Sequence, residues 1–242
     1  MVFGLFSKDR ALQRTIEKAT NKLAQQPDRF AALEKLRDLG SDEALFGLCK
    51  RFGITSMKGV EDEQEKNWVV DVLVKHGTAS LAPLTRYMKS AEQLAFPLRV
   101  LERIANRDQQ LSVVDELFAS EPPGYVRMPE RRIDLIKWFC EQAAMSDAEV
   151  VTRVTPYLAD FDENSRFSAI EGLAGKDPNL IGEPLVDALL RPDEESGRIR
   201  RTIVEVLERT QSKVGGRVSE VAALVARQFV DFKVDGGTVQ RK

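Results

Sequence analysis

Motifs for catalysis and metal binding are scarce in this 242-residue chain. It has two cysteines and one histidine, with no Cys-x-x-Cys pair and no His-Glu-x-x-His motif, so we predict no metal site. Phosphate-loop, dinucleotide-binding and Gly-x-Ser-x-Gly motifs are missing as well. The one histidine, His76, is expected at a helix C-terminus beside Gly77, where the helix dipole interacts favourably with a positively charged side chain. We therefore predict no catalytic residue and no cofactor.

The few cysteines do not make a disulfide framework. Cys49 and Cys140 each lie inside an apolar helical pattern, and free cysteines are among the residues most often buried. We interpret both as reduced core thiols, which favours a cytoplasmic location.

Long apolar runs are also missing. No stretch reaches the roughly 18–20 apolar residues of a membrane-spanning helix, and the apolar start lacks the basic region and cleavage site of a signal peptide. We interpret residues 1–9 as an apolar flap packed on the first helix. The alternative is a docking peptide, or a weak membrane contact made by Phe3, Leu5 and Phe6.

Neither sign of charge dominates the composition. The chain has 36 basic and 38 acidic residues and a net charge of −2, which gives no general attraction to nucleic acid or to anionic membranes. With 43% hydrophobic and 31% charged residues, the composition is that of an ordinary folded protein.

A repeated octapeptide is the main feature that the chain does contain. Residues 29–36 read RFAALEKL, and residues 166–173 read RFSAIEGL. The pattern has a basic residue at position 1, hydrophobic residues at positions 4, 5 and 8, and an acid at position 6. Its copies begin at Arg29, Lys66, Pro97, Arg132, Arg166 and Arg200. The steps between them are 37, 31, 35, 34 and 34 residues.

Each copy predicts an amphipathic helix, because positions 1, 4, 5 and 8 share one face at 100° per residue. Further helical patterns precede, separate and follow the copies, over residues 12–24, 42–52, 79–89, 109–118, 147–158, 180–190 and 218–229. Ser41, Thr78 and Ser146 stand where N-caps would. No strand is predicted. Two helices in each period of about 34 residues are typical of an α-solenoid.

The second helix of each unit resembles the HEAT repeat family. HEAT and HEAT-like (armadillo-type) repeats carry a V-R-x-x-A-A-x-A-L-G motif there, and residues 166–175 and 199–207 are similar to it, whereas the middle copies depart from it. The resemblance covers residues 10–230. It implies a single all-α domain, a right-handed α-solenoid of about six helical hairpins plus a C-terminal capping helix. We expect residues 231–242 to be a flexible tail.

Position 6 points away from the buried stripe and is acidic in five copies, at Glu34, Asp71, Glu102, Glu171 and Glu205. The resemblance to HEAT solenoids implies that these residues line the concave surface. They either pair with neighbouring basic residues as ordinary solvated charges, or form a groove for a basic or helical partner segment.

Position 1 is basic in five copies and lies near the buried stripe. Because a matching arginine forms an inter-repeat ladder in HEAT proteins, the resemblance implies a structural role for Arg29, Lys66, Arg132, Arg166 and Arg200. The expected partners are the acids just upstream or in the neighbouring turn, Asp28, Asp62, Glu130, Glu163 and Asp193.

Two connections are longer than stacked helices need, over residues 53–60 and 120–129. Both run from a first helix to its second, so both should project from the same edge. Met57, Lys58, Tyr125 and Arg127 are candidates for a partner-binding contact there, unless these loops are neutral insertions.

These features predict a non-catalytic protein–protein interaction scaffold or adaptor that binds a protein partner along its concave or loop-edge surface. The resemblance also admits a nucleic-acid-binding module of the HEAT-like DNA-glycosylase type, which would use Trp68, Trp138, Asp134 and Arg127. The near-neutral net charge disfavours that alternative. A HEAT-like chromophore lyase is a third possibility, for which no residue is diagnostic.

Overall fold

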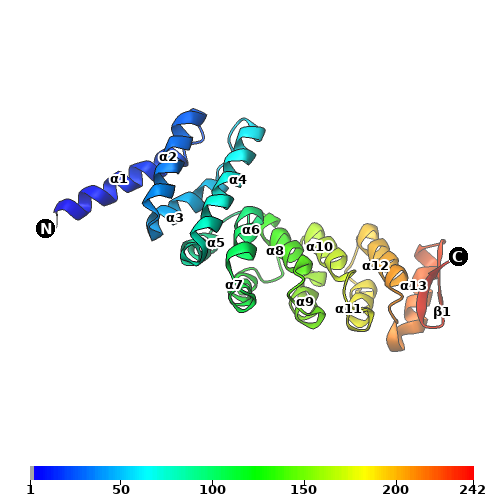
Figure 1. Ribbon diagram of the computed structural model, residues 1–242. Helices are drawn as coiled ribbons and strands as arrows, with labels where there is room; N and C mark the ends of the chain where they lie inside the picture. The colour runs from blue at the N-terminus through cyan, green and yellow to red at the C-terminus, as the bar shows by residue number, and fades with distance from the viewer. Residues whose placement is uncertain (1–2) are drawn as a thin grey trace. The chain divides into compact units, whose positions relative to one another are not determined.

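The computed structural model describes residues 3–242, with side chains from Asp9 onward. This part of the chain is mostly α-helical, as the sequence predicts, and ends in a short β-hairpin (Figure 1). It divides into two compact units, one ending at Ser120 and the other beginning at Glu121. The boundary lies inside the single repeat domain predicted for residues 10–230.

Within the described residues, the first unit is built from α-helices and two short 3-10 helices. Their bounds are α1 Phe3–Ala19, α2 Gln26–Leu39, α3 Asp42–Cys49, η1 Lys50–Gly53, α4 Gly59–His76, η2 Gly77–Ser80, α5 Leu81–Met88, α6 Ala95–Ile104 and α7 Arg107–Ser120. Gly40 ends α2 with a φ of +54°, and the Ser41 side chain caps α3 by accepting a hydrogen bond from the amide of Ala44. Thr78, expected as an N-cap, instead lies within η2, because α5 begins only at Leu81.

The helices of the first unit pack in two rows. The helices that carry octapeptide copies are neighbours, α2 against α4 and α4 against α6. The intervening helices are also neighbours, α1 against α3 and α3 against α5, and α2 packs on both α1 and α3.

A group of buried charges lies between α2, η1 and α4. Arg29 and Arg51 both bind Glu65, with Nε to Oε2 distances of 2.7 and 2.8 Å. Arg51 also donates to Asp62 at 2.7 Å, and Lys66 pairs with the other oxygen of Asp62 at 2.7 Å. All five side chains are buried. We call Arg29, Arg51, Asp62, Glu65 and Lys66 the buried charge cluster.

The buried charge cluster also holds the loop between η1 and α4. The Ser56 amide donates to Asp62 at 2.8 Å, and Arg51 donates to the backbone oxygen of Ile54 at 2.7 Å. Both bonds attach the loop backbone to buried side chains, while the neighbouring Met57 side chain is 95% exposed.

Acid should destabilise the first unit through Asp62. Burial by itself raises the pKa of the Asp62 carboxyl, but hydrogen bonds from Lys66, the Ser56 amide and Arg51 outweigh burial and lower the pKa from 3.8 to about 2. Since the folded-state pKa lies below the unfolded-state value, this stabilisation is fully present above about pH 4 and is lost as the pH falls through about 2.

Urea-unfolding midpoints measured by circular dichroism down to about pH 2 test this dependence. Asp62→Asn should lower the midpoint near neutral pH and make it less sensitive to acid. Glu63→Gln, which changes an exposed acid one residue away, should keep the wild-type pH dependence. Equal acid sensitivity in wild type and Asp62→Asn would contradict the prediction.

The second unit contains the remaining helices of the described chain and the β-hairpin. Their bounds are α8 Glu130–Glu141, α9 Asp147–Val154, η3 Thr155–Ala159, α10 Glu163–Leu173, α11 Pro178–Leu190, α12 Gly197–Thr210, η4 Gly215–Arg217, α13 Val218–Gln228, β1 Phe232–Asp235 and β2 Thr238–Arg241. Ser146 begins α9 in a capping box with Glu149, as its predicted N-cap position requires. The helices again form two rows, α8–α10–α12 and α9–α11–α13 (Figure 1).

The predicted buried stripe is confirmed in both units. Positions 4, 5 and 8 of every copy are buried except Ile104, which is partly exposed. The buried members are Ala32, Leu33, Leu36, Val69, Val70, Leu73, Val100, Leu101, Leu135, Ile136, Phe139, Ala169, Ile170, Leu173, Ile203, Val204 and Leu207. Each fully buried Leu, Ile, Val or Phe side chain contributes about 1.5–3 kcal/mol of hydrophobic stabilisation.

Helices α8 and α10 approach each other closely at Gly172. A Cβ atom on this residue would overlap the Sγ atom of Cys140. We expect Gly172→Ala to destabilise the second unit by about 1–3 kcal/mol, because the helices must separate or Cys140 must change rotamer. Gly175→Ala is the matched control, since no atom lies within 4 Å of the Cβ that it adds. Thermal unfolding of both variants measures the difference, and equal melting temperatures would contradict the prediction.

The segment expected to be a flexible tail instead contains two strands, where the sequence predicts none. Phe232–Asp235 pairs antiparallel with Thr238–Arg241, and the connecting Gly236 and Gly237 have φ values of +58° and +81°. Two central residues with positive φ are typical of a type I′ hairpin turn. Phe232 and Val239 are fully buried against the helical part of the unit, where β1 contacts α13 and β2 contacts α12. The Gly-Gly pair between Val-Asp and Thr-Val was the sequence signal for this hairpin.

The predicted N-terminal flap falls largely outside the described side chains. Residues 1 and 2 are not described, and the backbone from Phe3 onward forms the beginning of α1. The contacts proposed for Phe3, Leu5 and Phe6 therefore stay predictions.

Candidate functional site at the loop edge of the second unit

Arginine side chains organise one edge of the second unit. Arg132, near the start of α8, pairs with Asp160 and donates to the backbone oxygens of Pro122 and Gly124 at 2.7 and 3.0 Å. Asp160 is 1% exposed, and its second oxygen accepts a hydrogen bond from the Asp162 amide at 2.8 Å. Arg132 thus attaches the long loop before α8 to the turn before α10.

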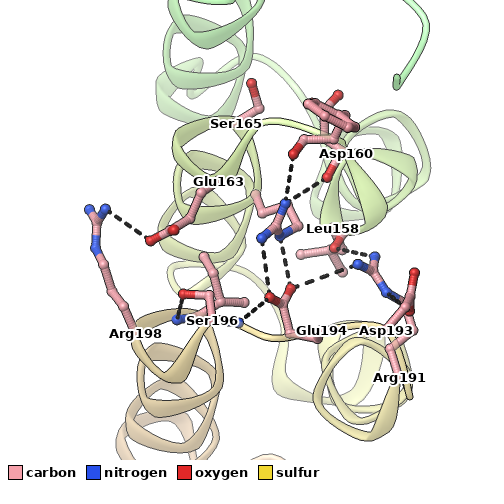
Figure 2. A network of polar contacts seen from close by, with 12 residues as sticks. Leu158, Asp160, Glu163, Ser165, Arg191, Asp193, Glu194, Ser196 and Arg198 are labelled. Carbon is pink, nitrogen blue, oxygen red and sulfur yellow. Dashed lines mark hydrogen bonds and ion pairs between the residues drawn. The ribbon is translucent and has the colours of Figure 1, made fainter. Parts of the chain in front are cut away.

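Arg166 on α10 repeats this arrangement with the next helix pair. Its Nε and Nη2 atoms lie 2.8 and 3.1 Å from the two carboxylate oxygens of Glu194, and its Nη1 donates to the backbone oxygens of Asp160 and Phe161. Glu194 is 2% exposed and accepts a hydrogen bond from the Ser196 amide at 2.9 Å. The Ser196 hydroxyl in turn caps α12 (Figure 2).

The two pairs have the same spacing along the chain. Arg132–Asp160 and Arg166–Glu194 each join residues 28 positions apart, and each member of the second pair follows its counterpart by 34 positions. The position 28 residues after Arg200 is Gln228, which is not an acid. The buried Nε of Arg200 has no hydrogen-bond partner in the described chain, so the series ends before the C-terminal hairpin.

Three basic residues of position 1, Arg29, Arg132 and Arg166, pair with acids outside their own helices, but most of the acids expected as partners are the wrong ones. The observed ion pairs are Arg29–Glu65, Lys66–Asp62, Arg132–Asp160 and Arg166–Glu194, so only Asp62 was predicted correctly. Asp28 and Glu130 adjoin their arginines in sequence but are exposed. These three arginines lie beside the buried stripe, so their side chains reach acids on neighbouring elements, whereas Lys66 pairs with Asp62 one turn earlier on α4.

A third arginine, Arg191, also joins segments of this edge. Arg191, just after α11, binds Asp193 through Nε at 2.8 Å, donates to the backbone oxygen of Leu158 at 3.2 Å, and lies 3.8 Å from Glu194 (Figure 2). Arg198 on α12 lies 3.5 Å from Glu163. Side chains of Arg166, Arg191 and Arg198 therefore connect the region between α9 and α10 to the region between α11 and α12.

A groove of about 700 Å³ lies over these connected loops. Its lining includes residues 123–125 and 193–196, together with Asp160, Phe161, Glu163, Arg166 and Arg191. We call it the loop-edge groove. Two of its aromatic side chains are largely exposed, Tyr125 at 75% and Phe161 at 69%. Their rings meet edge to face with centroids 5.3 Å apart.

The four loop residues predicted as a contact point are divided between the two units. Tyr125 lines the loop-edge groove, and the exposed Arg127 lies on the same loop. Met57 and Lys58 are exposed on the 54–58 loop of the first unit, where Lys58 pairs with Glu61 at 2.9 Å.

Phe161, Arg191 and Glu195 were not predicted as site residues. They lie on connections too short to attract attention by length. The available signal was Phe161 itself, a large apolar residue between Asp160 and Asp162 in a segment that ends one helix and begins another.

The acidic row predicted at position 6 is largely neutralised by basic neighbours. Glu34 lies 3.6 Å from Arg37, and Glu205 lies 2.9 Å from Arg201 one turn away. Asp71 and Glu171 pair across to the next helix of their rows; these pairs are Asp71–Arg103 at 3.1 Å and Glu171–Arg209 at 3.7 Å. Glu102 is exposed. The carboxylates of this row are thus not a bare anionic surface.

The cysteines and tryptophans lie in surroundings typical of structural residues. Burial raises the pKa values of the Cys49 and Cys140 thiols to about 12, so neither thiol is a ready nucleophile. Trp138 is buried, and Trp68 packs against Phe30 with ring centroids 4.9 Å apart. Among the described residues, no three His, Cys, Asp or Glu side chains gather where they could hold a metal ion. None of the helices in residues 3–242 combines the length and the apolar character needed to cross a membrane.

The spacing of the arginine–acid pairs is the strongest sign of a repeated architecture. No family model matches this chain. No curated protein and no solved structure matches it either. The resemblance to HEAT repeats therefore rests on the octapeptide motif and on the 34-residue step in the arginine positions.

Proposed function

We propose that this chain is a non-catalytic protein-interaction scaffold or adaptor, built as a right-handed α-solenoid of about six HEAT-like hairpins. The two rows of helices within each unit and the 34-residue step between the Arg132–Asp160 and Arg166–Glu194 pairs support the repeat architecture. We place it in the cytoplasm, because both cysteines are buried free thiols.

The observation that carries the binding proposal is the exposed aromatic pair of the loop-edge groove. Tyr125 and Phe161 expose most of their surface, although burying rings of this size is strongly favourable. Exposed apolar groups surrounded by polar residues mark interaction sites. The backbone beneath the rings is held by Arg132 and Arg166, so a partner would meet a preorganised surface and lose little free energy in ordering it. We therefore propose that the loop-edge groove takes up a segment of a partner protein.

The concave acidic row receives less support as the binding surface, because Glu34, Asp71, Glu171 and Glu205 already have basic neighbours. The nucleic-acid alternative is also weakened. Binding to the phosphate backbone needs available cations, and Arg132 and Arg166 are engaged by buried acids. No observation favours a chromophore lyase.

Selection from a random-peptide display library tests the proposal. The full chain is the bait, beside a Tyr125→Ala/Phe161→Ala variant and a Leu23→Ala control that removes a similarly exposed apolar side chain from the first unit. Peptides enriched on wild type and on Leu23→Ala, and lost from the double variant, would support the loop-edge groove as a peptide-binding site. Peptides that bind all three baits equally, or no enrichment at all, would refute it.

A further inference from the structure

We infer that the occupant of the loop-edge groove carries a cationic side chain, arginine in particular, whose head lies against Tyr125 and Phe161 and pairs with Glu195. This inference rests on the proposed function of the groove and specifies the chemistry of the partner. Three independent features support it. The arginines of the groove are already paired, the Glu195 carboxylate has no ion pair within the described residues, and no cation of the described chain covers the two aromatic rings.

The arginines that line the groove are already engaged. Arg166 donates to Glu194 and to two backbone oxygens, and Arg191 binds Asp193, the Leu158 carbonyl and Glu194. An anionic ligand would have to replace these bonds and leave the 2%-exposed Glu194 without its partners. Leaving a buried charge unpaired is strongly unfavourable. The groove is thus poorly suited to phosphates or to acidic segments.

The acids of the groove exceed its cations. The lining has five carboxylates, from Asp160, Glu163, Asp193, Glu194 and Glu195, and two guanidinium groups, from Arg166 and Arg191. Arg132 and Arg198 come from outside the lining to pair with Asp160 and Glu163. The exposed Glu195 carboxylate makes no ion pair within the described residues. A positive group brought by a partner would supply the missing charge.

The aromatic rings of the groove lack the cationic cover that other rings of this protein have. The guanidinium of Arg86 lies 3.8 Å from the ring centroid of Phe46, and that of Arg198 lies 4.1 Å from the centroid of Phe167. No cation of the described chain lies over Tyr125 or Phe161 in this way. Guanidinium groups stack on aromatic faces and pair with carboxylates at the same time, which favours arginine over lysine as the contacting residue.

A titration with matched peptides tests the inference. The probes are a capped pentapeptide in which two arginines alternate with glycines, and the same peptide with citrulline in place of arginine, which keeps the shape and removes the charge. Amide chemical shifts in ¹H–¹⁵N spectra of the full chain report binding up to millimolar concentration. We expect shifts around Tyr125, Phe161 and Glu195, and binding of the citrulline peptide that is about tenfold weaker, from the loss of a cation–π contact and an ion pair.

Two variants and one control separate the contributions. Glu195→Gln should weaken binding of the arginine peptide about threefold. Binding of the citrulline peptide should stay unchanged, since only the arginine peptide has a charge to pair with Glu195. Phe161→Ala should weaken binding of the arginine peptide by a similar factor, because it removes one of the two rings that the guanidinium would contact. Glu63→Gln, an exposed acid in the first unit, should change neither peptide.

Failure of this inference can be told apart from failure of the proposed function. If the display experiment yields peptides that need Tyr125 and Phe161 but lack arginine and lysine, the groove binds peptides and the inference is wrong. Equal binding of the arginine and citrulline peptides would also overturn it, as would the absence of shifts around the groove. If the display experiment finds no dependence on Tyr125 and Phe161, the proposed function fails as well.

Discussion

Glu65→Gln should lower the free energy of unfolding of the first unit by about 3–5 kcal/mol, the largest effect that we expect from a single change of charge. Glu65 is 2% exposed and binds both Arg29 and Arg51 through its carboxylate. The glutamine keeps the shape but removes the negative charge, which leaves three buried cations of the buried charge cluster facing Asp62 alone. An unpaired buried charge has lost its hydration without gaining a partner.

Tryptophan fluorescence can follow this unit separately during urea unfolding. Trp68 lies on α4 of the first unit, and Trp138 lies on α8 of the second, so a Trp138→Phe background leaves only the reporter of the first unit. Glu63→Gln, on the same helix but exposed, should change the free energy of unfolding by less than about 0.5 kcal/mol. If both glutamine variants unfold at the same urea concentration, the buried charge cluster does not stabilise the fold in the way its geometry implies.

Phe232→Ala should destabilise the second unit by about 3–5 kcal/mol. The Phe232 side chain is completely buried in the first strand of the hairpin, and the guanidinium groups of Arg241 and Arg201 lie 5.3 and 5.8 Å from its ring centroid. Truncation to alanine removes these contacts and leaves a cavity between the hairpin and the helices beneath it. The result would distinguish a docked hairpin from the flexible tail expected from the sequence.

Trp138 fluorescence in a Trp68→Phe background measures this effect on the second unit. Val230→Ala is the control, because Val230 lies two residues before Phe232 and is 83% exposed. Its free energy of unfolding should stay within about 0.5 kcal/mol of the parent. A Phe232→Ala variant as stable as Val230→Ala would mean that the hairpin adds nothing to the second unit in solution.

A residue of the candidate site could be predicted only where its own stretch of sequence was unusual. Tyr125 was found because its loop is unusually long for a connection between stacked helices. Phe161 was not found, because its significance depends on meeting Tyr125 across 36 positions of the chain. Arg191 and Glu195 likewise gain their roles from Glu194 and from the groove, and nothing in their immediate neighbours distinguishes them from ordinary surface charges.

The sequence by itself determined the features that depend on neighbouring residues. Leu33, Leu73 and Leu207 fall on the buried face because an α-helix repeats every 3.6 residues, and Ser41 and Ser146 begin helices because their hydroxyls satisfy the amides of the first turn. Only the tertiary structure decided which acid each arginine binds, how the hairpin docks and where a groove opens. Those outcomes depend on distances between segments some 30 residues apart, and the packing of whole helices sets these distances.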